Sequence, residues 1–487
     1  MVAEPTAGNH VAALARGGRT NFTGFVLRLL ARFPFLVIAA RLYGAESLGL
    51  FAYAIMVVEF AAALATMGLK RGLAGEMARD GRPEVQVLAD ALLLGLLAAC
   101  LATGVLLLFP GLMFPDEAET GAGRWFALII PAIVLADVSL AGLAFRHRIG
   151  PAVRARSLIE PWVLTLVATG LAFTVLKPGG LLIAYAVSLL AAVTASLWPA
   201  FRQFGWPEGW MPSTGRMLGI ARRNLPLAGA DLVEWSTRRL DVFILGLFAS
   251  SAVVGLYFVA QQVASLAGKI RSSFDPILAP LLSASLKAGK PDEAAAHLRQ
   301  VGFWVLALQL PVVLALGLPA EGILGLFGPE FAAGGLVLAF LLVAELAAAS
   351  SSVSEMGLIY THPRYNLIIA VSCLALQAGL SLLLVPQFGG EGASGALLIS
   401  LTVAAIARQL VLSWALRAPV AFWRWSLLAA GGLAFAFGYA ARALPELPEM
   451  LVAIPGVLLI FAGVIWRWGF GPDDRALFSG GRVRSRD

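Results

Sequence analysis

The feature that most constrains this chain is a series of long apolar stretches that recurs from one end to the other. Each is about 20 residues long, which is the length that an α-helix needs to cross ~30 Å of hydrocarbon. Only 13% of the residues are charged, against roughly a quarter in a soluble domain. The sequence therefore predicts an all-α polytopic membrane protein. Its fourteen predicted transmembrane helices lie at residues 21–41, 47–68, 86–109, 125–145, 158–176, 180–201, 225–249, 252–268, 300–319, 332–354, 366–385, 392–415, 425–443 and 448–467.

The distribution of basic residues predicts the orientation of these helices. With the N-terminus placed in the cytoplasm, 27 of the 36 Lys and Arg residues fall on the cytoplasmic side, 4 fall outside and 5 lie within helices. Such a bias predicts a multi-pass membrane protein with an even number of helices and both termini cytoplasmic. It also accounts for the net charge of +7, so no nucleic-acid partner is expected. The N-terminal apolar stretch is expected to stay as an uncleaved first helix.

Three pairs of similar positions indicate an internal repeat of about six helices. Gly49 and Gly255 follow a helix end and a turn of small residues, 206 positions apart. Two pairs of prolines that follow corresponding helices have offsets of 209 and 208: Pro110 with Pro319, and Pro178 with Pro386. Repeats of this kind build alternating-access carriers, in which the substrate site lies between the halves.

This repeat predicts the domain organisation. Two lobes of six helices each are expected, followed by two further helices. The expected boundaries are 1–201 for the N-terminal lobe, 202–224 for a linker along the inner membrane surface, 225–415 for the C-terminal lobe, and 416–487 for the last two helices and a cytoplasmic tail.

Three segments carry a resemblance to a known family. These are ARLYGAESLGLFAYAIMVVEFAAALATMGLKRGLA, ILGLFGPEF and LLLVPQFGGEGASGALL. In order and spacing they resemble the bacterial flippases that export O-antigen or exopolysaccharide repeat units, relatives of MATE drug exporters and of the lipid II flippase in the MOP superfamily. The resemblance covers nearly the whole chain. It implies movement of an undecaprenyl-diphosphate-linked oligosaccharide from the inner to the outer leaflet, and it implies a location in the bacterial cytoplasmic (inner) membrane. Polysaccharide polymerases or ligases are possible partners.

Charged residues inside two predicted helices point to a substrate site, because ionisable groups in hydrocarbon are costly. In the first helix, Asn21, Arg28 and Arg32 fall within a ~40° stripe. The seventh helix, its repeat partner, carries a second polar stripe. This stripe contains Asp231, Glu234, Arg238 and Asp241, beside Arg239.

Guanidinium groups stay charged when buried and bind phosphate oxygens in pairs. The predicted diphosphate contacts are therefore Arg28, Arg32, Arg238 and Arg239. The alternative is that these arginines only neutralise nearby carboxylates. Arg408, near a predicted cytoplasmic helix end, is expected to extend its charge to the membrane surface.

Carboxyl groups at mid-depth are candidates for ion coupling, since burial makes protonation easier and carboxylate oxygens also bind Na⁺. Glu59, Asp137 and Glu345 lie near the middle of their helices. Asp231, Glu234 and Asp241 of the seventh helix join them as candidates. The alternative for each is a permanent structural pair. H⁺ or Na⁺ is the possible coupling ion, and no other cofactor, metal site or catalytic residue is predicted.

Two other functions remain open from the sequence. A MATE-like multidrug or cation antiporter would need an acidic, aromatic cavity, which the arginines of the first helix argue against. A polysaccharide polymerase or ligase would need a sizeable outer loop with catalytic groups, whereas the longest predicted outer connection is 110–124. The chain is thus predicted to be a carrier rather than an enzyme.

Overall fold

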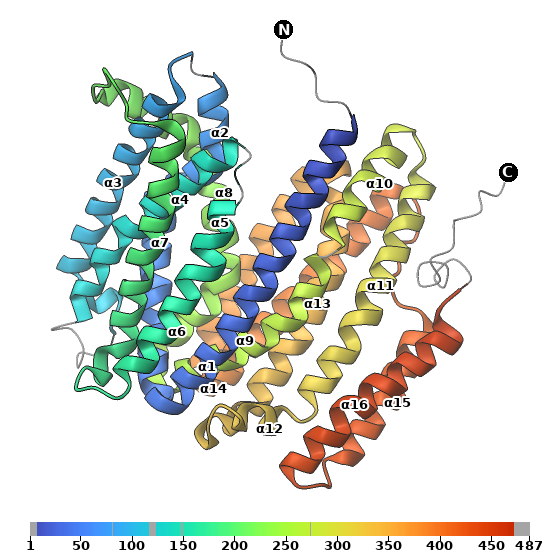
Figure 1. Cartoon of the computed structure of the whole chain (residues 1–487). Coiled ribbons are helices and arrows are strands. Elements are labelled where there is room, and N and C mark those ends of the chain that lie inside the picture. Colours follow the sequence, from blue (N-terminus) through green and yellow to red (C-terminus); the bar gives the residue numbers. More distant parts are fainter. Residues whose placement is uncertain are drawn as a thin grey trace. The chain divides into compact units, whose positions relative to one another are not determined.

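The computed structural model describes residues 7–471 except 80, 116–122, 147, 149 and 273. It describes side chains from Phe33 onward, except those of residues 234, 237, 238, 272 and 275–277. The chain forms two compact units. Unit 1 comprises residues 1–239 and 250–255, and unit 2 comprises residues 240–249 and 256–487. Every regular element in the described part of the chain is helical (Figure 1).

Unit 1 consists of long helices connected by short helical segments and turns. The elements are α1 (Ala7–Ala65), α2 (Leu69–Arg79), α3 (Glu84–Leu108), η1 (Pro110–Leu112), η3 (Gly123–Ile129), α4 (Ile130–Phe145), α5 (Gly150–Val153), η4 (Arg154–Ile159), α6 (Glu160–Leu171), η5 (Lys177–Gly179) and α7 (Gly180–Phe204). Helix α8 (Thr214–Phe248) begins in unit 1 and ends in unit 2.

Unit 2 holds the rest of the chain. Its elements are α9 (Ser251–Ser272), α10 (Asp275–Lys287), α11 (Pro291–Gly317), α12 (Ala320–Gly325), η6 (Pro329–Gly334), α13 (Gly335–Thr361), α14 (Pro363–Leu416), α15 (Trp425–Ala441), α16 (Glu446–Val464) and η7 (Ile465–Gly469), with the first turn of α9 in unit 1. Helices α15 and α16, red in Figure 1, pair as a hairpin.

Two of the longest helices each contain a sharp break at a glycine. In α1 the break is at Gly44 (φ 80°, ψ 172°), and in α14 it is at Gly389 (φ 53°, ψ −126°). Both conformations have positive φ, which glycine adopts without the steric penalty of a side chain. Each break divides one continuous ribbon into two membrane-spanning segments. Counted in this way, the described residues form fourteen long helices, and the predicted fold class is confirmed.

Two helices absent from the prediction lie in connections that were expected to be loops. They are α2 and α10, and α10 begins 206 residues after α2, which is the offset of the glycine repeat. In α2 the buried residues Leu69, Leu73 and Met77 recur every four positions, so the helix is amphipathic. Its polar face lowered the local hydropathy and hid it from a search for apolar stretches.

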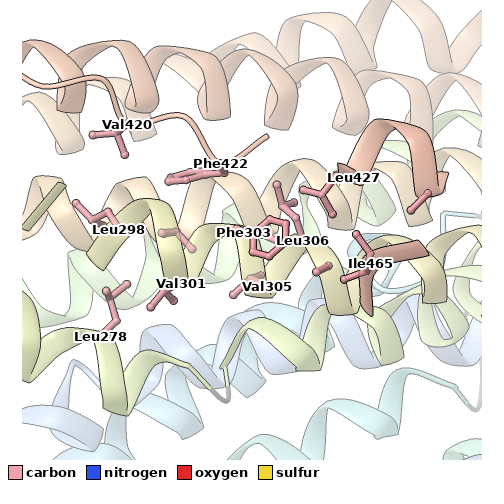
Figure 2. Close-up of a cluster of buried hydrophobic side chains, with 14 of the residues drawn as sticks. Leu278, Leu298, Val301, Phe303, Val305, Leu306, Val420, Phe422, Leu427 and Ile465 are labelled. Carbon is pink, nitrogen blue, oxygen red and sulfur yellow. The ribbon is translucent and has the colours of Figure 1, made fainter. Parts of the chain in front are cut away.

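The core of unit 2 is built from apolar side chains of helices that are far apart in the sequence. Leu298, Phe303 and Leu306 of α11 pack against Phe422 of the α14–α15 connection and Ile465 after α16 (Figure 2). Phe303 and Phe422 are fully buried. This packing ties the last two long helices to the rest of unit 2.

The repeat-related glycines of unit 1 contact each other. A Cβ atom placed on Gly49 would lie 1.7 Å from the carbonyl oxygen of Ser251, and one placed on Gly255 would lie 2.0 Å from that of Ala45. Such distances leave no room for any side chain. The first turn after the Gly44 break and the first turn of α9 are therefore in backbone contact.

Candidate functional site

Four of the residues predicted for the site have side chains outside the described part of the structure. These are Arg28, Arg32, Glu234 and Arg238. The backbone places the first two on α1 and the other two on α8. The remaining candidates divide between the units: Glu59, Asp137, Asp231 and Arg239 lie in unit 1, and Asp241 and Glu345 lie in unit 2.

Asp137 belongs to a triad centred on an arginine that the sequence analysis had counted as a loop residue. Arg156 lies in η4, a π-helical turn, and its Nη2 contacts Oδ1 of Asp137. Its Nη1 donates to Oε2 of Glu160 at 2.8 Å. Nζ of Lys70 lies 3.9 Å from the other oxygen of Asp137. One guanidinium therefore holds two carboxylates, from α4 and α6.

The triad could have been found only in part from the sequence. Arg156 and Glu160 are four residues apart, a spacing at which opposite charges meet on a helix. The hydropathy pattern, however, placed Arg156 before the predicted start of its helix. Asp137 is distant in sequence, and its pairing depends on how α4 packs beside η4.

Glu59 accepts a hydrogen bond from the hydroxyl group of a buried tyrosine. Oη of Tyr185 lies 3.2 Å from its Oε1. Nη2 of Arg239 lies 3.8 Å from its Oε2, at the long end of the range for an ion pair. Arg239, predicted as a diphosphate contact, is thus placed beside a carboxylate, which is the alternative arrangement that the sequence left open.

A further ion pair joins α2 to α8. Nε of Arg71 lies 2.7 Å from Oδ1 of Asp231. We refer to these eight side chains together as the paired-charge face of unit 1. Its members are Glu59, Lys70, Arg71, Asp137, Arg156, Glu160, Asp231 and Arg239.

The paired-charge face is neutral overall and partly open. It has four acidic and four basic members, and their side chains range from 15% exposed for Asp231 to 64% exposed for Lys70. Charged side chains on membrane helices face a polar interior or water, because exposure to lipid is costly. The face therefore marks the side of unit 1 that is turned away from hydrocarbon.

The two carboxyl candidates of unit 2 lie among other polar groups. Asp241, 1% exposed, accepts hydrogen bonds from Oη of Tyr257 at 2.6 Å and from Nε2 of Gln261 at 3.0 Å. Glu345 lies against the backbone of α9, where a Cβ on Gly268 would come within 2.3 Å of its Oε2. Gln309 donates to the backbone carbonyl of Glu345 at 2.8 Å.

Arg408 does not reach the membrane surface, and the prediction that it does is wrong. It is 9% exposed. Its Nη1 donates to Oγ of Ser351 at 2.7 Å and its Nε to Oδ1 of Asn366 at 3.0 Å, while Oε2 of Glu355 lies 3.3 Å away. These oxygens satisfy the guanidinium inside unit 2, so extending it to the surface would gain nothing.

Comparisons with solved structures define the class of this fold. The chain is similar to the lipid II flippase MurJ in an inward closed conformation, with a TM-score of 0.76 and 14% identity, over 92% of this chain and 98% of that one. It is also similar to a MATE family multidrug resistance transporter of the MOP superfamily in an inward-facing conformation. That match has a TM-score of 0.66 and 18% identity, over 80% and 94% of the two chains. The fold is that of the MOP-superfamily transporters.

The family follows from the sequence comparison. The model of the polysaccharide biosynthesis protein family matches residues 14–284, and the chain belongs to this family. A curated relative is the probable flippase AglR of Haloferax volcanii, which is 27% identical over 180 residues. That match spans 36% of this chain and 38% of the relative. The resemblance to polysaccharide transporters expected from the sequence is confirmed.

Proposed function

We propose that this protein is a carrier that moves undecaprenyl-diphosphate-linked oligosaccharide repeat units from the inner to the outer leaflet of the bacterial cytoplasmic membrane. The observation that supports this most strongly is the paired-charge face, on membrane helices of a member of the polysaccharide biosynthesis protein family. The similarity to probable flippase AglR and the fold shared with lipid II flippase MurJ support it further.

The arginines predicted for the site suit an anionic headgroup. Guanidinium groups bind phosphate oxygens bidentately and stay charged in a dry site. We propose Arg28, Arg32, Arg238 and Arg239 as the diphosphate contacts. Since Arg239 already lies beside Glu59, an incoming diphosphate competes with a carboxylate for the same guanidinium.

Transport would proceed by alternating access. The headgroup enters from the cytoplasm while the lipid tail stays in the bilayer, and the site then opens to the outer side. For this cycle to run, the substrate must stabilise the two states differently. An H⁺ or Na⁺ gradient would drive the return. The candidate coupling residues are Glu59, Asp137, Asp231, Glu234, Asp241 and Glu345. The partners are membrane lipid, the lipid-linked glycan and a polysaccharide polymerase or ligase.

The experiment that tests this proposal compares surface polysaccharide in a strain lacking the protein and in the complemented strain. Loss of polysaccharide, with undecaprenyl-linked repeat units left facing the cytoplasm, supports the proposal. The double variant Arg28→Ala/Arg32→Ala should then fail to restore export at normal membrane levels. Each lost charged contact is worth about 1.5–3 kcal/mol, or roughly 10- to 150-fold in binding. Reporter fusions should find both termini in the cytoplasm.

A second candidate is a MATE-like multidrug or cation antiporter, which the fold shared with MATE transporters favours. The paired-charge face argues against it, because four basic groups balance its four acids, whereas an organic cation needs a net acidic site. If the strain lacking the protein makes normal glycans and is sensitive to cationic drugs, the antiporter replaces the flippase as the proposed function.

A further inference from the structure

Residues 214–239 of α8, which is most of the helix, belong to unit 1, although the repeat assigns this helix to the second half of the chain. We infer that this segment of α8 is a fixed part of unit 1 and moves with it, and that Glu76 and Asp90 are the positioning residues that hold it there. The inference rests on the proposed function in one respect: it concerns a carrier whose units move during transport.

Asp90 joins the start of α8 to α3. Its side chain is fully buried, and three donors from different segments converge on it. Nη1 of Arg82 lies 2.8 Å away, Nε of Arg216 3.1 Å and Nε1 of Trp210 2.8 Å. A buried carboxylate is stable only while such partners remain. The connection before α8 and its first turn are thereby tied to α3.

Glu76 forms the second tie, between α2 and α8. It is 5% exposed and is held by the guanidinium of Arg223, with Nη2 2.6 Å from Oε2 and Nε 3.1 Å from Oε1. Nδ2 of the buried Asn224 adds a further bond at 3.2 Å. The bidentate geometry fixes direction as well as distance. The register of α8 against α2 is therefore set at this point.

Close backbone packing reinforces this contact. A Cβ atom on Gly72 would lie 1.5 Å from Oδ1 of Asn224, and one on Gly68 would lie 2.6 Å from its carbonyl oxygen. Helices this close cannot slide past each other without breaking buried polar contacts. The contact has the character of a helix–helix interface inside a folded unit.

The same face of α8 continues to the charged residues of the site. Beyond Arg223 it presents Asp231 to Arg71, Trp235 to Phe60 with ring centroids 4.7 Å apart, and Arg239 to Glu59. Positions four residues apart lie on one side of a helix. Glu76 and Asp90 thus act through α8, by placing Asp231 beside Arg71 and Arg239 beside Glu59.

Cross-linking α8 to α2 tests whether the two ever separate. The variant carries Gly72→Cys and Asn224→Cys, in a background in which Cys100 and Cys373 are replaced by Ser. Since a Cβ added to Gly72 would lie 2.7 Å from Cγ of Asn224, the two Cβ atoms fall within the roughly 3.5–4.5 Å that a disulfide needs. The matched control joins α3 to α4 through Gly95→Cys and Val134→Cys, where a Cβ added to Gly95 would lie 2.9 Å from Cγ1 of Val134.

We expect oxidation of either pair to leave export within about twofold of the reduced protein, since neither bond would restrain a moving contact. A loss of at least about tenfold that reduction reverses, seen for the α2–α8 pair and not for the control, would overturn the inference. The reduced form of each variant shows whether the substitutions themselves are tolerated.

A distance measurement in the full chain tests the inference without a transport assay. One spin label is placed on the exposed Cys100 of α3 and the other on Leu218→Cys of α8, with Cys373 replaced by Ser. We expect one narrow distribution that undecaprenyl diphosphate does not change. A second population, or a shift of about 5 Å or more as in domain movements, contradicts the inference.

The positioning role of Glu76 has its own test in the same labelled protein. Glu76→Gln removes the charge that holds Arg223, and we expect it to broaden the Cys100–Leu218 distribution. Glu293→Gln, at an exposed ion pair of α11, is the control and should leave the distribution unchanged. An unchanged distribution in Glu76→Gln excludes the positioning role.

A second label pair, Cys100 with Leu308→Cys of unit 2, shows whether the units move. This measurement distinguishes failure of the proposed transport cycle from failure of this inference.

Discussion

Arg156 in unit 1 and Arg408 in unit 2 are both enclosed by oxygen atoms, but the oxygens differ in kind. Arg156 contacts the carboxylates of Asp137 and Glu160 and keeps 22% of its side chain exposed. Arg408 is 10% exposed by side chain, and two of its three described partners are neutral oxygens of Ser351 and Asn366. The comparison teaches that one side-chain type serves two purposes. In unit 2 it joins helices mainly through neutral oxygens, whereas in unit 1 its charge is balanced by two carboxylates.

The largest expected effect tests the charge balance of unit 1. Arg156→Ala leaves two carboxylates without their shared partner, and removing one partner of a buried pair costs about 3–5 kcal/mol. We expect a lower thermal midpoint of the detergent-solubilised protein, followed by tryptophan fluorescence. The matched control is Arg154→Ala, an exposed residue of the same turn. Equal midpoints for the two variants would show that the triad does not stabilise unit 1.

A smaller loss of stability is expected when Arg408 of unit 2 is replaced. Arg408→Ala removes hydrogen bonds to neutral oxygens, which leaves fewer uncompensated charges than Arg156→Ala, so we expect a cost of about 1.5–3 kcal/mol. The measurement is the same thermal midpoint, with the exposed Arg364→Ala as control. If Arg408→Ala destabilises the protein more than Arg156→Ala, the distinction between the two arginines fails.

Two buried tyrosines that donate to carboxylates extend the comparison. Tyr257→Phe removes a 2.6 Å bond to Asp241, a residue 1% exposed, at an expected cost of about 1–3 kcal/mol. Tyr185→Phe removes a 3.2 Å hydrogen bond to Glu59, whose side chain is 33% exposed. Because water can take the place of the hydroxyl, the free energy of unfolding should fall by less than about 1 kcal/mol. Both are measured as changes in thermal midpoint, and the reverse order would contradict this account.

Replacing Glu59 should have the smallest effect on stability and a large effect on transport. Glu59→Gln keeps an acceptor for Tyr185 and loses a long, partly exposed ion pair with Arg239, which is worth no more than about 1 kcal/mol. If Glu59 belongs to the transport site, export in the complemented strain should still fall by about tenfold or more. Glu293→Gln, which removes an exposed acid in unit 2, is the control. Normal export in Glu59→Gln removes this residue from the site.

Hydropathy and charge bias were sufficient to predict the fold. They could count fourteen helices because each span must be apolar over a fixed length, whatever it packs against. They missed α2, because its polar face lowers the hydropathy. They also missed α10, because its 13 residues are too few for a membrane span. They also placed the start of α8 at residue 225 instead of Thr214, since Arg216, Arg222 and Arg223 resemble a loop when their partners are unknown.

The sequence identified several charged residues of the site one by one, but it did not show which of them pair. Glu59, Asp137 and Asp231 stood out because each interrupts an apolar run. The basic partners of Asp137 and Asp231 did not, because Lys70, Arg71 and Arg156 lie outside the predicted spans and were assigned to cytoplasmic loops. Pairing depends on the packing of helices that are distant in the sequence, and hydropathy carries no information on that.

The contact between Gly49 and Gly255 bears on the origin of the chain. The two positions correspond in the repeat, so each glycine meets its own counterpart. In a symmetric dimer, a residue that touches its own copy lies next to the two-fold axis. A half-length ancestor that paired with itself would have made this same contact once, with a single glycine serving both sides. Duplication and fusion would then have produced two positions that both require glycine. Neither position could gain a side chain afterwards, since the backbone of its neighbour already fills the space.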